Sequence, residues 1–404
     1  MLCYNMCERR YIMKILSVNA GSSSLKFTMF ELPECKVIIG GTFEKIGIDG
    51  SFYTIKYNGN KDKKEVQMKD HTAAVKILLD ELINYGVIKS YDEIDGVGHR
   101  LVHGGDKYTS SIIIDEDVEK TVEELIPLAP LHNSANLVGV RSFKEVLPNT
   151  PMVAVWDTAF HQTMKEEEFL YAVPYSWYEK YGVRKYGFHG TSHRYISETM
   201  KELYGENTKI ISCHIGNGAS LCAIKNGKCI DTSMGFTPIA GVVMGTRCGD
   251  IDVGLIPYVM SKTGKTFDEV MTDLNKNSGM LGLTGVSSDM RDVEESYERK
   301  DSRSVDAMNV YIKKIVDYIS MYNTLLEGCE YIVFTAGVGE NSNLVRSEVI
   351  KRLSFMGIKL DEEKNNQRGI SGVISTDDST VKVLVIPTDE ELMIAKDTYE
   401  LINK

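Results

Sequence analysis

The chain has 404 residues, of which 43% are hydrophobic and 25% are charged, and its formal net charge is −11. This composition is typical of a globular protein, and the length favours two domains. The acidic charge argues against nucleic acid or an anionic membrane as a partner. No stretch approaches the ~18 apolar residues of a membrane span, and the N-terminus lacks the apolar segment of a signal peptide.

The eight cysteines show neither a C-x-x-C pair nor a zinc-binding spacing; they stand at positions 3, 7, 35, 213, 222, 229, 248 and 329. Such scatter favours free thiols in a reducing compartment, and we expect a cytoplasmic protein. Residues 1–12 share no pattern with the rest of the chain, whereas Met13 begins the first apolar strand. We therefore expect Met13 to be the functional start and residues 1–12 to be a loose extension.

A small-residue turn joins the first two predicted strands. The apolar strand Ile15–Val18 leads into Asn19, Gly21 and three serines, and an alternating strand leaves through Leu25, Phe27 and Met29. Exposed backbone N–H groups, hydroxyls and the following Lys26 suit a phosphate. The turn lacks the G-x-x-x-x-G-K-[ST] spacing, and no helix follows it, so it is not a P-loop. An ordinary serine-rich hairpin is the alternative.

The same order of elements occurs twice along the chain. Strands at 36–43 and 52–57, a helix at 71–85 and a buried strand at 94–102 follow the first hairpin. From Lys209 a strand again enters a small-residue turn, Gly216–Ser220, and a second strand leaves it toward the hairpin signal Asn226-Gly227. An approximate repeat of half the chain predicts two similar domains with a phosphate hairpin each. We expect the ligand in a cleft between them.

Two later strand ends are further candidates for a site. The strand Tyr331–Phe334 opens through glycines into a helical stretch, 342–353, and a helix N-terminus binds nucleotide phosphates. A lone Gly-x-Gly is by itself only weak evidence for such a site. The strand Val381–Ile386 is followed by Glu390 and Glu391, which suit either a divalent metal or the dipole of the final helix.

Histidines, arginines and one aspartate carry the candidate chemistry. Seven of the eight histidines lie between positions 99 and 214, although core histidines are a common alternative. Arg100 ends a buried strand, and Arg247 lies in a loop of small residues. Two such arginines can neutralise a transferring phosphoryl group; alternatively each pairs with a carboxylate, Arg247 with Asp250 for instance. Asp157 ends the apolar run 152–156 and can accept a proton, orient a group or hold a magnesium shell.

Read together, these segments resemble the acetate kinase family from Met13 to the last helix. The ordered matches are NAGSSSLKF (19–27), GHRLVHGG (98–105), APLHN (129–133), WDTAFH (156–161), KYGFHGTSH (185–193), HIGNGAS (214–220), MGTRCGDID (244–252), NSGMLGLTGVSSDMRD (277–292), FTAGVGENS (334–342) and IPTDEEL (386–392).

The resemblance implies Mg²⁺-dependent, reversible transfer of the ATP γ-phosphoryl group to acetate, giving acetyl phosphate and ADP, with Mn²⁺ as a substitute metal. It implies a duplicated, actin-like two-domain α/β fold, as in sugar kinases and Hsp70, with an interdomain active-site cleft, and a homodimer. Residues 13–157 with 388–404 would form the N-terminal domain, closed by the C-terminal helix. Residues 158–387 would form the nucleotide-binding and dimerisation domain.

The motif matches also assign residues. Catalysis would rest on Asp157, His189, Arg247 and Arg100, of which Arg100 also binds substrate. Magnesium would be held by Asn19 and Glu390. The acetate methyl would lie against Val102, Leu131, Phe188 and Pro238. ATP would be bound by Ser22, Ser24, Lys26, His214, Ile215, Gly216, Asn217, Gly218, Asp289, Met290, Arg291, Gly337, Val338, Gly339, Glu340 and Asn341.

Departures from the family pattern leave the acyl chain length open. Ser134 replaces a proline, and Ile239-Ala240 replaces Leu-Glu, both beside the expected acyl pocket. Asp389 replaces an asparagine next to Glu390 and is expected to alter Mg²⁺ affinity. Propionate or butyrate kinase is therefore the alternative activity. A more distant alternative is a non-catalytic, ATP-driven module of the actin or Hsp70 kind, because fold alone does not imply function.

Overall fold

The first hairpin of the chain forms as its alternating pattern predicts. The computed structural model describes residues 12–367 and 369–404, so the expectation for residues 1–11 lies outside the described part. In β1 (Met13–Ala20) and β2 (Ser24–Leu32) the strands pair antiparallel, with Asn19 opposite Lys26. The residues through Ala159 together with Asp389–Lys404 form one compact unit, unit 1, and Phe160–Thr388 form a second, unit 2.

Unit 1 contains one mixed sheet with strand order β5-β4-β3-β2-β1-β6-β8-β7. Its centre is parallel, because β1 pairs with β6 and β6 pairs with β8 in the same direction. Its remaining elements are β3 (Lys36–Glu44), β4 (Phe52–Tyr57), β5 (Asn60–Glu65), α1 (His71–Asn84), β6 (Gly96–Leu101), β7 (Ile112–Ile113), α2 (Glu116–Glu124), α3 (Pro130–Val146), β8 (Met152–Trp156) and α15 (Glu390–Ile402).

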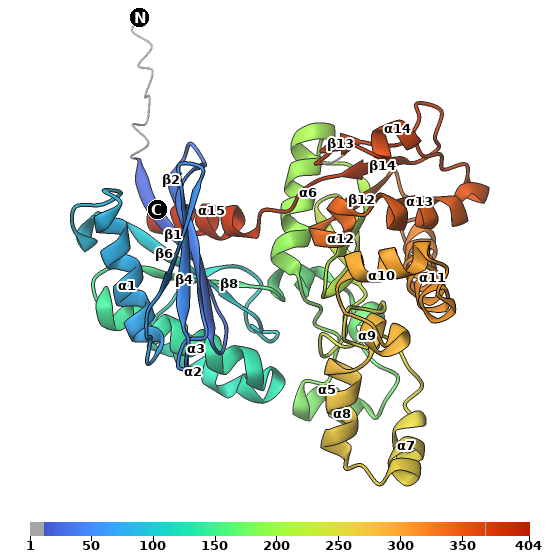
Figure 1. The fold of residues 1–404 in the computed structure, drawn as a ribbon, viewed down its shortest axis with the longest axis horizontal. Coiled ribbons are helices and arrows are strands. Elements are labelled where there is room, and N and C mark those ends of the chain that lie inside the picture. Colours follow the sequence, from blue (N-terminus) through green and yellow to red (C-terminus); the bar gives the residue numbers. More distant parts are fainter. Residues whose placement is uncertain (1–11, 368) are drawn as a thin grey trace, which may run out of the picture. The chain divides into compact units, whose positions relative to one another are not determined.

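Helices cover the sheet of unit 1, and α15 lies beside β1 and β6 (Figure 1). Gly98 permits this close approach, since a Cβ there would lie 2.2 Å from the Thr398 hydroxyl and 2.6 Å from Ile394. Leu16, Val18 and Ala20 of β1 belong to the apolar core that α1 and α3 share with the sheet, whereas Ile15 packs with Ala395 and Tyr399 of α15. The final helix of the chain therefore completes the first unit.

Unit 2 repeats this central arrangement in a sheet of order β11-β10-β9-β12-β14-β13. Its strands are β9 (Lys209–Ile215), β10 (Ala219–Lys225), β11 (Lys228–Thr232), β12 (Tyr331–Thr335), β13 (Gly372–Val373) and β14 (Lys382–Val385). The hairpin β9–β10 is antiparallel, and β9, β12 and β14 run parallel. The central order β3-β2-β1-β6-β8 thus has its counterpart in β11-β10-β9-β12-β14, which confirms the repeat inferred from the sequence.

Helices flank the second sheet as well, with α6 and α11 on opposite sides of it (Figure 1). The helices of unit 2 are α4 (Glu166–Phe169), α5 (Tyr175–Tyr181), α6 (Gly190–Tyr204), α7 (Leu255–Thr263), α8 (Phe267–Lys276), α9 (Gly279–Thr284), α10 (Met290–Glu298), α11 (Ser302–Leu325), α12 (Ala336–Asn341), α13 (Asn343–Arg352) and α14 (Glu362–Asn365). The sequence predicts a helix only over 342–353, but the preceding glycine-rich run 336–341 is itself the short helix α12.

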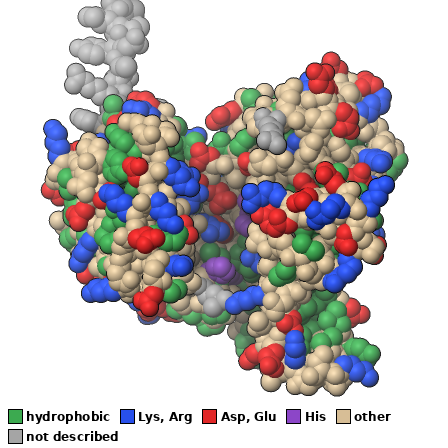
Figure 2. All heavy atoms as spheres, viewed as in Figure 1, with side chains coloured by type: hydrophobic (Ala, Val, Ile, Leu, Met, Phe, Trp, Pro, Cys, Tyr) green, Lys and Arg blue, Asp and Glu red, His purple; other side chains and the backbone are tan. Residues whose placement is uncertain are grey.

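Acidic and basic side chains are interspersed over the visible face of each unit (Figure 2). Among the described residues, no helix is both long and apolar enough to cross a membrane. The cysteines within the described part are free thiols.

Candidate functional site

Unit 1 brings Arg100 and Asp157 together at the ends of two neighbouring strands. Arg100 lies near the end of β6 and Asp157 directly follows the parallel strand β8, so both side chains arise at the same edge of the sheet. Arg100 Nε lies 3.0 Å from Asp157 Oδ1, and Nη2 lies 2.5 Å from Oδ2. The Asp157 side chain is only 1% exposed. Arg100 therefore has a carboxylate partner, yet its two-point grip leaves Nη1 directed elsewhere.

The predicted metal residues lie beside this ion pair. Arg100 Nη1 is 3.5 Å from the Asn19 amide oxygen, and Arg100 Nε is 3.9 Å from Glu390 Oε2. Burial lowers the pKa of Arg100, but the charges of Asp157 and Glu390 outweigh it, so the pKa is raised overall. Burial raises the pKa of Glu390 to about 7, although the Arg100 charge opposes this. An amide oxygen and a carboxylate thus gather around one permanent cation.

The serine hairpin presents its polar groups to solvent. Ser22, Ser24 and Lys26 are exposed, and the turn is closed by a 2.8 Å hydrogen bond from Gly21 N–H to the Ser24 carbonyl. Lys26 forms an ion pair with Glu391 in the first turn of α15. Asp389 caps that helix, since its carboxylate accepts a hydrogen bond from the Leu392 N–H at 2.9 Å. The hydroxyls remain accessible to an anion.

Arg247 in unit 2 has no carboxylate partner among the described residues, although the sequence analysis gave such a pair as an alternative. Its Nη1 donates to the Pro238 carbonyl at 3.1 Å, and no ion pair of Arg247 occurs within the described residues. Asp250 instead accepts from the Gly241 N–H at 2.7 Å and from the Tyr318 hydroxyl, so the alternative Arg247–Asp250 pair is wrong. Burial lowers the pKa of Arg247. A partly buried guanidinium whose hydrogen bonds within the described residues go to a carbonyl and to the Met244 sulfur is costly unless it serves an anion.

His189 lies next to the second hairpin. It belongs to a group of histidine and serine side chains that contact one another through hydrogen bonds and ring stacking. It precedes α6 with a left-handed backbone (φ 58°), and its Nδ1 lies 2.9 Å from Ser220 Oγ. The His189 ring stacks on His214 at 4.2 Å between centroids. A Cβ placed on Gly218 would lie 3.5 Å from both the His189 ring and Arg247 Nη1. Gly218 therefore lies between the two groups, and its missing side chain leaves room for a ligand.

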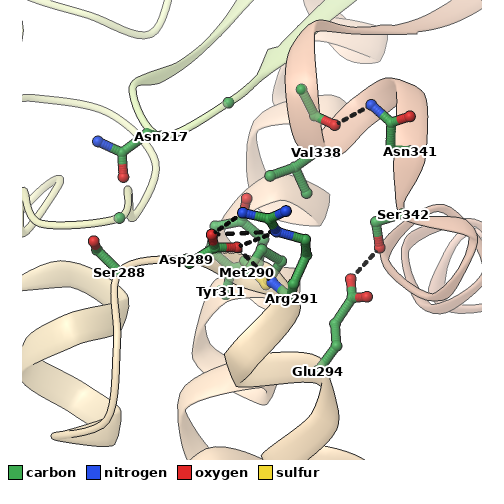
Figure 3. Close-up of a pocket in the computed structure, with 13 residues that line it drawn as sticks. Asn217, Ser288, Asp289, Met290, Arg291, Glu294, Tyr311, Val338, Asn341 and Ser342 are labelled. Carbon is green, nitrogen blue, oxygen red and sulfur yellow. Dashed lines mark hydrogen bonds and ion pairs between the residues drawn. The ribbon is translucent and has the colours of Figure 1, made fainter.

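A cavity of about 660 Å³ lies wholly within unit 2 (Figure 3). Three separate segments predicted to bind ATP contribute to its lining, namely the second hairpin, the start of α10 and helix α12. The lining comprises Gly216, Asn217, Gly245, Ser288, Asp289, Met290, Arg291, Glu294, Tyr311, Gly337, Val338, Asn341 and Ser342. The described structure thus joins segments that lie far apart in the sequence.

Two hydrogen-bonded side-chain pairs lie on the cavity wall. Arg291 binds the Asp289 carboxylate with Nη2 at 2.5 Å, and this hydrogen bonding lowers the pKa of Asp289 to about 2 (Figure 3). The Ser342 hydroxyl donates to the Glu294 carboxylate. A polar rim beside the apolar Met290 and Val338 suits a ligand with both a base and charged groups.

Some predicted nucleotide residues do not line this cavity. His214 and Ile215 are buried in β9, and Gly218, Gly339 and Glu340 are likewise absent from the lining. The Glu340 carboxylate accepts hydrogen bonds from the Ala336 N–H at 2.8 Å and from the Thr388 N–H at 3.1 Å. It therefore stabilises the start of α12 rather than facing the cavity.

The four predicted acyl-pocket residues divide between the units. Val102 is buried in unit 1, where its N–H donates to the Asn136 side chain at 3.0 Å. Leu131 lies in α3, and its side chain is outside the described part. Phe188 and Pro238 belong to unit 2, and the Pro238 carbonyl is the acceptor for Arg247.

Two lining residues had no local signal in the sequence. Tyr311 and Glu294 come from α11 and α10, and both positions lie outside the recognised segments. Gly245, Ser288 and Ser342 lie inside the recognised segments 244–252, 277–292 and 334–342, but they were not among the residues predicted to bind ATP. Gly245 reaches the cavity because its N–H donates to the Asn217 carbonyl at 2.9 Å.

The chain is similar to known proteins over almost its whole length. The model of the acetokinase family matches residues 14–396. The acetate kinase of Geobacillus kaustophilus (strain HTA426) is 56% identical over 393 residues, which cover 96% of this chain and 99% of the relative. That of Bacillus mycoides (strain KBAB4) is 54% identical over 391 residues, covering 96% of this chain and 98% of the relative.

Two solved structures have the same fold. A crystal structure of the acetate kinase of Porphyromonas gingivalis has a TM-score of 0.92 at 47% identity, covering 96% of this chain and 99% of the other. A propionate kinase from Francisella tularensis subsp. tularensis SCHU S4 also has a TM-score of 0.92, at 37% identity, covering 96% of this chain and 100% of the other. The duplicated two-domain α/β fold predicted from the sequence is thereby confirmed.

Proposed function

The chain belongs to the acetokinase family, and from this premise we propose that it transfers the γ-phosphoryl group of ATP reversibly to acetate. The products are acetyl phosphate and ADP. The observation that carries the proposal is the partly buried guanidinium of Arg247, which lacks a carboxylate partner within the described residues and lies beside His189 and the second hairpin. Such a cation suits a transferring phosphoryl group.

The transfer requires positioning and charge neutralisation rather than a covalent enzyme intermediate. We propose direct in-line attack by the acetate oxygen on the γ-phosphorus. Arg247 would neutralise charge on the equatorial oxygens, and His189 would add a hydrogen bond there. Arg100, held in one orientation by Asp157, would bind the acyl carboxylate or acyl phosphate. The ion pair supports an orienting role for Asp157, because both of its oxygens already accept hydrogen bonds from Arg100.

Asn19 and Glu390 are the proposed magnesium residues. Their amide and carboxylate oxygens are of the type that Mg²⁺ prefers, and Mg²⁺ is usually held by one or two carboxylates together with substrate phosphates. Both lie near Arg100, so the fit is to a phosphate-bound ion rather than to a closed protein cage. When bound, the metal would supply charge neutralisation on the phosphate chain.

The cavity in unit 2 is the proposed nucleotide site. Its size and mixed lining suit a nucleotide, and the exposed serine hairpin of unit 1 offers hydroxyls for phosphate oxygens. The acyl group would lie against Val102, Leu131, Phe188 and Pro238. A homodimer and a cytoplasmic location, both expected from the sequence, stay predictions.

The test is ATP-dependent acyl phosphate formation, trapped as the hydroxamate. We expect Arg100→Ala and Arg247→Ala to lower kcat by ~10³-fold each. Arg352→Ala is the matched control, because within the described residues the hydrogen bonds of this arginine go to Asn309, away from the candidate site. Folded Arg100 and Arg247 variants with near-wild-type rates would contradict the proposal. ATP hydrolysis indifferent to added carboxylate would instead support the actin-like or Hsp70-like module.

The chain length of the substrate needs its own measurement. One methylene is worth only ~1–3 kcal/mol in a hydrophobic pocket, so propionate and butyrate are close competitors. We propose acetate, and a comparison of kcat/KM for the three carboxylates tests this. A larger kcat/KM for propionate or butyrate would overturn the choice of acetate while leaving the phosphoryl transfer intact.

A further inference from the structure

Three soft donor atoms converge in the interior of unit 2. The His161 Nδ1, the Cys222 Sγ and the Cys229 Sγ lie within 4.8 Å of one another, and all three residues are fully buried. The Nδ1–Sγ distance from His161 to Cys229 is 3.2 Å, and the two sulfurs are 3.4 Å apart. The cysteines come from the neighbouring strands β10 and β11. None of the three has a role in the phosphoryl transfer proposed above.

The hydrogen bonding of His161 fixes which ring nitrogen faces the sulfurs as an electron-pair donor. Its Nε2 lies 2.9 Å from the Phe188 carbonyl, which can only accept, so Nε2 carries the hydrogen. Nδ1 therefore offers its lone pair to Cys229. A ring nitrogen bound to a backbone carbonyl is the usual second contact of a metal-ligating histidine.

The two thiols are the donors that must lose protons when a cation binds. The Cys222 thiol donates a hydrogen bond to the Cys229 sulfur at 3.4 Å, so the two sulfurs already face each other. A thiolate is the form of cysteine that binds metals.

We propose that His161, Cys222 and Cys229 form a binding site for a single soft cation, the cuprous ion. Binding forms two copper–sulfur bonds and one copper–nitrogen bond. The two S–H bonds break and their protons leave to solvent, so neither the copper nor the sulfur changes oxidation state. Thiolate and imidazole ligands select soft and borderline ions, whereas Mg²⁺ prefers oxygen donors.

The number of donors favours copper(I) over zinc. Structural zinc sites are almost always four-coordinate. Within the described residues, the group contains three histidine, cysteine or carboxylate donors. The neighbouring Asp231 is engaged by Lys185 Nζ at 2.5 Å and by the Thr232 N–H at 2.7 Å. A buried three-donor set therefore matches an ion that accepts low coordination numbers.

Copper binding at this site would affect the candidate active site through Phe188, which links His161 to His189. Phe188 accepts the His161 hydrogen bond, and His189 is the next residue in the chain. A change in the position of His161 would thus act on the segment that holds His189. We expect copper loading to raise the Tm and to change kcat in the same protein, but not in a variant without the two thiols.

The experiment uses the full chain, reduced and handled without oxygen, titrated with copper(I) against a chromophoric copper(I) chelator. The wild-type protein is expected to withdraw one tight equivalent that Cys222→Ala/Cys229→Ala has lost. Cys213→Ala/Cys329→Ala is the matched control, because it removes two other buried thiols of the same unit and should retain that equivalent. Equal copper uptake by the two double variants would overturn the site.

X-ray absorption at the copper edge of the loaded wild-type protein makes the test independent of how the variants fold. Two sulfur donors and one nitrogen donor are expected. A four-donor shell, a shell without nitrogen, or displacement of copper(I) by equimolar zinc would refute the assignment. Because these measurements need no catalysis, they are separate from the tests of phosphoryl transfer.

Discussion

Arg100 and Asp157 form a two-point ion pair, Nε to Oδ1 at 3.0 Å and Nη2 to Oδ2 at 2.5 Å, at adjoining ends of parallel strands. The carboxylate is almost completely buried. Such a pair fixes the plane of the guanidinium, which a single hydrogen bond would leave free to rotate. The guanidinium therefore loses its rotational freedom when the protein folds, before any substrate binds.

Asp157→Asn should damage both the fold and the rate. The amide keeps the size of the side chain but loses its charge and can accept only with one oxygen, so Arg100 is left partly uncompensated. Removing one partner of a buried pair costs ~3–5 kcal/mol, and we expect kcat to fall by at least ~10²-fold because Arg100 loses its orientation. Urea denaturation and the acyl phosphate assay measure the two effects.

The matched control for Asp157 is Glu123→Gln. Glu123 also binds an arginine, with Arg141 Nη2 at 2.5 Å, but both side chains are about half exposed. An exposed pair is worth only ~0–1 kcal/mol, so this variant should match the wild type in both assays. An Asp157→Asn protein with the wild-type kcat would show that the ion pair serves stability alone.

Arg247→Met should lower the activity strongly and leave the stability almost unchanged, whereas Asp157→Asn should lower both. Methionine fills much of the arginine volume, and no carboxylate is orphaned because Arg247 has no ion pair within the described part of the chain. Since burial already disfavours this cation, the free energy of unfolding should change by less than about 1 kcal/mol. The kcat should fall ~10³-fold. Denaturation curves and initial rates of the purified variant check both values.

Arg346→Met provides the contrast for Arg247. Arg346 is 1% exposed, and its guanidinium donates to the Asn365 side chain at 2.7 Å and to the Gly339, Glu340 and Asn365 carbonyls at 2.8–2.9 Å. Losing these bonds leaves buried acceptors unsatisfied and should cost several kcal/mol, at ~1–3 kcal/mol each. If Arg247→Met were as destabilised as Arg346→Met, the anion-binding role of Arg247 would fail.

The strands and their repeat were predictable because their signals are local. Apolar alternation and small-residue turns identify both hairpins, and the parallel strands follow as buried apolar runs. The strand β5 was missed, since its residues Asn60–Glu65 are all polar and exposed. It forms a strand because it pairs antiparallel with the edge of β4. In this pairing Phe52 lies opposite Glu65 and Tyr57 lies opposite Asn60.

The site was predictable only in pieces. The segments at 216–217, 289–291 and 337–341 stood out by composition or resemblance, but their meeting in one cavity depends on the packing of unit 2. Helix α12 was not predicted, because it begins at Ala336, whose positive φ of 64° has no signal in the sequence. The Glu340 carboxylate that accepts the Ala336 N–H stabilises this start. A cleft shared by the two domains stays a prediction.

Gly337→Ala tests the proposed nucleotide site without disturbing the fold. A Cβ at this position meets no atom within 4 Å in the described structure, although Gly337 lines the cavity. Alanine also favours a helix over glycine by up to ~1 kcal/mol. We therefore expect unchanged or slightly raised stability, a several-fold higher KM for ATP, and an unchanged KM for acetate. Steady-state kinetics with each substrate varied in turn provides the measurement.

Gly339→Ala is the matched control in the same helix. Its Cβ would make ordinary contacts of 3.5–3.7 Å with Cys213, Phe334 and Ile215, and Gly339 does not line the cavity. The KM for ATP should stay at the wild-type value in this variant. If both glycine variants behaved alike toward ATP, the cavity would not be the nucleotide site.

His99 should make the protein lose stability in mild acid. It is buried in the core of unit 1, 3.4 Å from the Met152 sulfur and edge-on to Phe143. Burial, aided by the charge of Lys144, lowers its pKa to about 3.

The unfolded chain binds this proton near pH 6.5, whereas the folded chain does so only near pH 3. The stabilisation is therefore complete above about pH 6.5 and is lost, at up to about 1.4 kcal/mol per pH unit, as the pH falls toward about 3. His99→Leu removes the titrating group and leaves an apolar side chain. Urea denaturation from about pH 7 to about pH 4 should therefore give a shallower decline in stability than in the wild type. Parallel curves would mean that the pKa of His99 does not change on folding.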